Sequence, residues 1–85
     1  MQVIHWGRAR QFFQTDEKAE DALERWRIAV LASQWKDFQD LLATFDTARY
    51  ADGKVTFDLK ADAIRLTAVA DYKNDKLYIR QISNY

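Results

Sequence analysis

Two arginines within stretches of alternating apolar and polar residues are the chain's most informative candidates for chemistry. Arg65 lies in "AIRLTAVADY" and Arg80 lies in "LYIRQISNY". Apolar residues that recur at every second position are typical of a strand with one buried face. An arginine at an intervening position then faces away from the core. Such a guanidinium can bind phosphate through two parallel hydrogen bonds and can stabilise charge that develops on phosphorus during RNA cleavage.

The chain has few residues that could support other kinds of catalysis. There is no cysteine, so a thiol nucleophile and a disulfide framework are both excluded. His5 is the only histidine and a candidate base, although a lone histidine near an N-terminus is more often structural or exposed. His5 has no histidine or cysteine partner for a metal site, and acidic pairs such as Asp16-Glu17 suit a helix N-terminus instead. We therefore expect neither a metal nor a cofactor.

The composition predicts one small globular domain over residues 1–85. No apolar run approaches the roughly 18 residues of a membrane span. The first residues, "MQVI", lack the basic start and apolar stretch of a signal peptide, so we expect a cytoplasmic protein without membrane contact. The 13 Lys and Arg balance 13 Asp and Glu, with the basic excess in the second half. A polyanion-binding surface must therefore be local and lie in the C-terminal half.

The hydrophobic period changes from helical to alternating near the middle of the chain. Helices are predicted over about 7–14, 16–33 and 37–45, the second with Thr15 or Asp16 as its N-cap. Three strands are predicted around Val55–Leu59, 64–72 and 77–82, and Val3-Ile4 adds a short one. This order predicts an α+β fold. Two or three N-terminal helices pack on one face of a mainly antiparallel sheet of about four strands.

Turn chemistry predicts the register of the last hairpin. Asn74-Asp75 suits a two-residue loop, which sets Val69 opposite Arg80 and Ala70 opposite Ile79. Both arginines then share the sheet face away from the helices with further polar residues: Lys54, Thr56, Thr67, Asp71 and Tyr78.

The preceding hairpin is expected to close at Lys60-Ala61, with Thr56 opposite Arg65, and "DGK" at 52–54 predicts another hairpin turn. In this register Val69 and Ile82 are apolar residues on the polar face. The alternative to a binding surface is a solvated face on which Asp71 pairs with Arg80.

The stretch "VTFDLKADAIRLTAVADYKNDKLYIRQI" resembles the HigB family of type II toxins, in the RelE-like superfamily. That family typically reads like "VVFNIGGNKYRLVVAINY", a short turn and "VFIRF". The match runs without a gap and includes seven coincident residues: Val55, Phe57, Arg65, Leu66, Tyr72, Ile79 and Arg80. The opening "MQVI", "AEDALERW" and the tryptophan of "SQWKDF" are also similar to the family.

The resemblance implies a RelE-like fold and a toxin that cleaves mRNA, commonly on the ribosome. It implies neutralisation by a cognate HigA-like antitoxin with a helix-turn-helix domain. It also implies candidate catalytic residues, which are Arg65, Arg80 and Tyr85, and an RNA-binding surface formed by Lys54, Lys60, Arg65, Tyr78 and Arg80.

The C-terminal run departs from the family pattern. The family continues after "IRF" with a run like "VGTHAEYD", whereas this sequence has "ISNY", and Tyr85 falls where the family carries a histidine. Lys60 and Ala61 replace the family's two glycines. Cleavage by 2′-OH attack needs a base and an acid, and a phenol donates a proton more readily than it accepts one at neutral pH.

Several alternatives therefore stay open. The chain could be a truncated toxin, a naturally short active toxin, or a catalytically inactive RelE-like protein that only pairs with an antitoxin. An unrelated small α+β adaptor is a further alternative.

Overall fold

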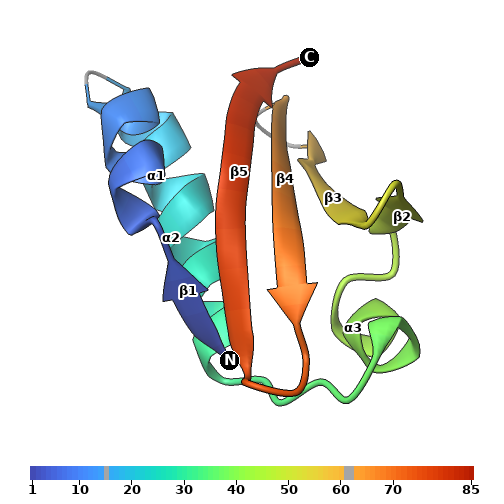
Figure 1. Ribbon diagram of the computed structural model, residues 1–85. Helices are drawn as coiled ribbons and strands as arrows, with labels where there is room; N and C mark the ends of the chain where they lie inside the picture. The colour runs from blue at the N-terminus through green and yellow to red at the C-terminus, as the bar shows by residue number, and fades with distance from the viewer. Residues whose placement is uncertain (15, 61–62) are drawn as a thin grey trace.

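The fold consists of three helices and one five-stranded sheet (Figure 1). The computed structural model describes residues 1–14, 16–60 and 63–85. The elements follow in chain order: β1 (Gln2–Ile4), α1 (Trp6–Phe13), α2 (Glu17–Leu31), α3 (Phe38–Thr44), β2 (Arg49–Ala51), β3 (Lys54–Leu59), β4 (Ile64–Asp71) and β5 (Lys76–Asn84). The strand order is β1-β5-β4-β3-β2, with β1 parallel to β5 and the other pairs antiparallel. The predicted α+β class is confirmed, and β2 is an additional strand.

The helices α2 and α3 each begin at an aspartate that caps them, whereas His5 at the start of α1 forms no side-chain cap with the described residues. The Asp16 carboxylate accepts hydrogen bonds from the backbone N–H groups of Lys18 and Ala19 at 3.0 and 3.2 Å, which confirms Asp16 as the N-cap of α2. Thr15, the other predicted cap, lies outside the described residues. Asp37 caps α3 in the same way by accepting from the N–H of Asp40 at 3.0 Å.

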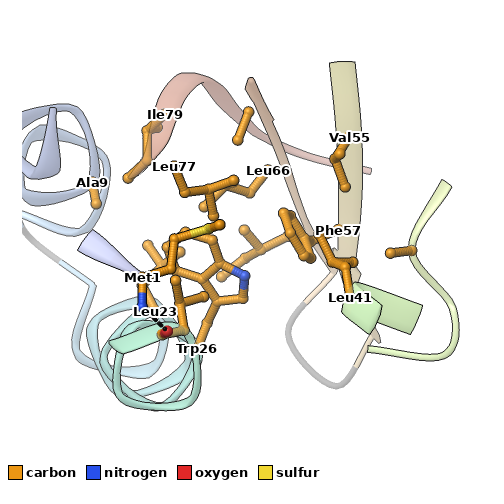
Figure 2. Packing of buried hydrophobic residues seen from close by; sticks show 14 of the residues in the cluster. Met1, Ala9, Leu23, Trp26, Leu41, Val55, Phe57, Leu66, Leu77 and Ile79 are labelled. Carbon is orange, nitrogen blue, oxygen red and sulfur yellow. Dashed lines mark hydrogen bonds between the residues drawn. The ribbon is translucent and has the colours of Figure 1, made fainter. Parts of the chain in front are cut away.

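One apolar core joins all three helices to one face of the sheet. Figure 2 shows Trp26 of α2 and Phe57 of β3 pointing into the same space as Leu66 of β4 and Leu77 of β5. The Trp26 and Phe57 rings meet edge to face with centroids 5.4 Å apart, which is a favoured aromatic geometry. The opposite face of the sheet is therefore left without a helix layer, as the alternation of apolar and polar residues predicts.

The predicted register of the β4–β5 hairpin is wrong by two residues. Ala70 lies opposite Leu77 rather than Ile79, because residues 72–75 form a four-residue loop. Asp71 accounts for the longer loop: its carboxylate accepts from the backbone N–H and the side-chain amide of Asn74 at 3.2 and 2.8 Å. Asp71 therefore does not pair with Arg80.

The β3–β4 register also differs by two residues from the prediction. Arg65 lies opposite Asp58 rather than Thr56. The predicted turn residue Ala61 lies outside the described residues. The turn at "DGK" is confirmed: Asp52 and Gly53 have φ values of 54° and 76°, as a type I′ turn requires. A shift of two residues preserves the alternation, so Arg65 keeps its predicted face.

A β-bulge places one extra residue in β5. Ala68 lies opposite Ile79, but the preceding Thr67 lies opposite Gln81, so Arg80 is left without a partner on β4. The pairing beyond the bulge puts Ile82 opposite the fully buried Leu66. Ile82 therefore lies on the core face, and its predicted position on the polar face is wrong.

We expect Phe57→Ala to lower the free energy of unfolding by about 3–5 kcal/mol, because it removes a buried aromatic ring between α2 and the sheet. Phe57 is 2% exposed and also meets the Phe45 ring at 5.1 Å. Tyr50→Ala is the control, since Tyr50 is 57% exposed and should cost no more than about 1 kcal/mol. Urea unfolding of both variants measures the difference, and equal losses would contradict this account of the core.

Candidate functional site

An ion-pair cluster occupies the uncovered face of the sheet at β2, β3 and β4. Arg65 Nε lies 2.9 Å from one oxygen of Asp58, and Arg65 Nη2 lies 3.5 Å from the other. Arg49 Nη1 lies 3.0 Å from the second oxygen. Only 8% of the Asp58 side chain is exposed, against 41% for Arg65 and 55% for Arg49. The carboxylate is thus covered by two guanidinium groups that remain open to solvent.

Each charge in this cluster stabilises the others. The hydrogen bond from Arg65, together with the positive charge of Arg49, lowers the pKa of Asp58 below its ordinary value, against the opposing effect of burial. The hydrogen bond to Asp58 in turn raises the pKa of Arg65. Two arginines share one carboxylate, so the cluster retains a single net positive charge. Arg65 is held rigidly, but much of its charge is compensated.

Tyr85 lies directly over Arg65. The Arg65 Cζ atom is 4.8 Å from the centroid of the Tyr85 ring, which is a cation–π contact. The backbone N–H of Tyr85 donates to the Ala63 carbonyl oxygen at 2.9 Å. This hydrogen bond holds the backbone of Tyr85 next to β4. Two of the three predicted catalytic residues, Arg65 and Tyr85, are therefore in contact.

Arg80 lies apart from this pair and differs from it electrostatically. Arg65 is opposite Ser83, three residues along β5 from Arg80, which corresponds to roughly 10 Å. Arg80 is exposed and forms no ion pair with any carboxylate of residues 1–14, 16–60 and 63–85. It also occupies the bulge, a feature that often re-aims a side chain at a functional site. Among the described residues, no carboxylate compensates the positive charge that Arg80 presents on its strand.

The remaining predicted RNA-binding residues do not gather at one point. Lys54 begins β3 and Lys60 follows its end, so the two exposed lysines are separated by roughly 20 Å of strand. Tyr78 lies nearer the β1 edge, where its ring meets the His5 ring at 6.0 Å. Together these residues outline a broad surface. None of the described segments brings three metal-binding side chains of His, Cys, Asp or Glu together.

Sequence reasoning missed Asp58 and Arg49. Asp58 alternates with the buried Val55 and Phe57 of β3, so its face was predictable, but the assumed register put Thr56 opposite Arg65. A carboxylate across the ladder from an arginine would have been the signal. Arg49 gave no such signal because β2 is only three residues long.

The fold and the exposed arginines define a small α+β protein with a polar, cation-bearing sheet face. The family model that matches is HigB_toxin, described as the RelE-like toxic component of a toxin-antitoxin system, over residues 19–85. This match covers more than half of the chain. The chain therefore belongs to the HigB_toxin family, and membership implies an antitoxin partner. No curated protein matches the chain. Among the described helices, none has the length and apolar character needed to cross a membrane.

Because of the Asp58 cluster, we expect the free energy of unfolding to fall at acid pH. The folded pKa of Asp58 lies below the ordinary 3.8, so the unfolded chain binds more protons as the pH falls. The stabilisation is therefore complete above about pH 4 and is lost as the pH falls through the folded pKa. We expect Asp58→Asn to cost about 1 kcal/mol at pH 7 and progressively less below pH 4.

Urea unfolding between pH 3 and pH 7 measures this difference. Asp21→Asn is the matched control, because the Asp21–Arg25 pair is exposed on α2 and should contribute little at any pH. A constant difference between the wild type and Asp58→Asn over the whole range would contradict the assignment.

Proposed function

We propose that this toxin is an mRNA endoribonuclease that acts on ribosome-bound mRNA in the cytoplasm and is neutralised by a HigA-like helix-turn-helix antitoxin. The family match supports the toxin class. The observation that carries the enzyme proposal is Arg80, an exposed guanidinium without a carboxylate partner among the described residues, held at a bulge of the sheet. A neutral overall charge suits an enzyme that relies on the ribosome to present its substrate.

The proposed reaction is attack of a ribose 2′ oxygen on the adjacent phosphorus. The O2′–P bond forms and the P–O5′ bond breaks, which leaves a 2′,3′-cyclic phosphate and a 5′-hydroxyl group. The 2′ proton goes to a water molecule that acts as the base, and the leaving 5′ oxygen takes a proton from an acid. Negative charge increases on the phosphoryl oxygens in the transition state. Arg80 is placed to stabilise that charge because its own charge is not compensated by Asp58.

Arg65 and Tyr85 take different roles in this proposal. Arg65 has its Nε edge turned to Asp58, so it offers the opposite edge of the guanidinium to a phosphate. The Tyr85 hydroxyl is the proposed proton donor to the leaving oxygen, and contact with Arg65 orients its ring. Lys54, Lys60 and Tyr78 contact the RNA on either side.

A second candidate function is a catalytically inactive RelE-like protein that only binds the antitoxin. The Asp58 ion pair favours it, because a compensated Arg65 is what a purely structural arginine of the sheet would show. The two functions differ in what happens when Arg80 is changed.

We expect Arg80→Ala to abolish growth arrest and to slow mRNA cleavage by about a hundredfold or more, because it removes charge stabilisation in the transition state. Arg80→Lys should recover only part of the activity, since lysine keeps the charge but loses the planar fork. Arg65→Ala should reduce activity and also lower thermal stability, because Asp58 loses its shortest partner. Growth after induction, cleavage in a translating extract and thermal melting measure the three effects.

Arg25→Ala is the matched control, since Arg25 is an exposed arginine of α2 whose one ion pair within the described residues is with Asp21. It should leave growth arrest, cleavage and melting unchanged. A folded Arg80→Ala protein with full cleavage activity would rule out the catalytic role of Arg80. A wild-type protein that binds antitoxin but never cleaves translated mRNA would favour the binding-protein function.

A further inference from the structure

A pocket lies between α1 and the end of β5, beside the bulge. Its volume is about 350 Å³, and its lining comes from two segments far apart in the sequence: Arg8, Gln11, Phe12, Arg80, Gln81 and Ile82. The three α1 residues are spaced i, i+3 and i+4 and so share one helix face. In Figure 1, α1 lies alongside the half of β5 that continues beyond β1. The pocket is of a size that holds a small ligand or one unit of a polymer.

The lining has the chemistry of an anion site. Arg8 and Arg80 come from different elements, and none of the described residues that line the pocket with them is acidic. Neither arginine forms an ion pair within the described part of the chain, whereas Arg25, Arg49 and Arg65 each do. Two like charges at one pocket repel unless an anion neutralises them. Their convergence therefore favours a negatively charged ligand.

The other lining residues suit a nucleotide better than a bare anion. Gln11 and Gln81 each provide amide donors and an acceptor, as the edge of a base requires. Phe12 and Ile82 provide an apolar wall against which a base or ribose can pack. A phosphate with an attached nucleoside would contact the arginines, the glutamine amides and the apolar wall at the same time.

We propose that Arg8 is an RNA-binding residue of this toxin, which holds a second phosphate of the substrate across the pocket from Arg80. Arg80 contacts the scissile phosphate, Arg8 contacts its neighbour, and the intervening nucleotide packs in the pocket against Phe12. This inference rests on the proposed function. The bulge lies within the same lining, because Arg80 is the residue that it leaves without a partner on β4 and Gln81 and Ile82 follow it.

Binding of a six-nucleotide, 2′-O-methylated RNA tests the proposal without requiring cleavage. Each phosphate contact on a single strand contributes about 0.7 to the slope of log affinity against log salt. We expect Arg8→Ala to weaken binding about tenfold and to reduce that slope by about 0.7. Arg10→Ala is the control: Arg10 is another exposed arginine of α1, it does not line the pocket, and its removal should leave the slope unchanged.

Two further comparisons identify the class of ligand. Adenosine 5′-monophosphate should bind far more weakly than the hexanucleotide, because it offers one phosphate instead of several. Equal binding of the two would instead make the pocket a site for free nucleotide and would overturn the RNA assignment. Equal slopes for Arg8→Ala and Arg10→Ala would also overturn the RNA assignment. If Arg8→Ala then weakened antitoxin binding, the pocket would be a protein-binding site.

If the proposed endoribonuclease function is wrong, a different measurement shows it. In that case the wild type does not cleave mRNA in a translating extract, whatever the hexanucleotide binding shows. Thermal melting of Arg8→Ala should match the wild type, because Arg8 is exposed and lacks an ion pair among the described residues.

Discussion

The extra residue in β5 is the constraint on which both the core and the proposed site depend. A regular strand points every second residue to the core, so Leu77 and Ile79 would be followed there by Gln81. The next apolar residue is Ile82. The bulge resolves this conflict by leaving Arg80 unpaired and turning Ile82 inward opposite Leu66. Burial of Ile82 and the loss of a cross-strand partner for Arg80 are therefore two results of the same irregularity.

The structure also divides four arginines of the sheet and α1 into two electrostatic kinds. Arg65 and Arg49 share the Asp58 carboxylate, which fixes their positions and compensates part of their charge. Arg80 and Arg8 line one pocket, and the other described residues of its lining are not acidic. We propose that phosphate binds most strongly beside α1, while the Asp58 cluster offers a rigid and weaker contact. A chain with no net charge can thus concentrate positive charge locally, as the proposed RNA site requires.

Much of this fold was predictable from the sequence, and the failures have definite causes. Periodicity located the three helices and the long strands, and the side chain of Asp16 marked the start of α2. Both hairpin registers failed by two residues. In the second hairpin Asp71 caps a longer loop than Asn74-Asp75 suggests. Because each error was an even number of residues, the faces of β3 and β4 stayed correct while the cross-strand partners did not.

The site was less predictable than the fold. The spacing of Leu77, Ile79 and Ile82, two residues and then three, is a sequence signal for the bulge. Arg8 left no comparable signal, because the β5 residues that share its pocket come from the opposite end of the chain. Tertiary packing alone brings α1 to β5, and local patterns contain no information about that contact.

The central claim is that this toxin cleaves translated mRNA by attack of the 2′ oxygen. The most direct measurement is to map the 3′ ends of ribosome-associated mRNA after induction of the toxin and to determine their chemistry. The account predicts new ends that carry 2′,3′-cyclic phosphate within translated regions. Unchanged mRNA ends in cells that nevertheless stop growing, or new ends that carry a 3′-hydroxyl group, would contradict it.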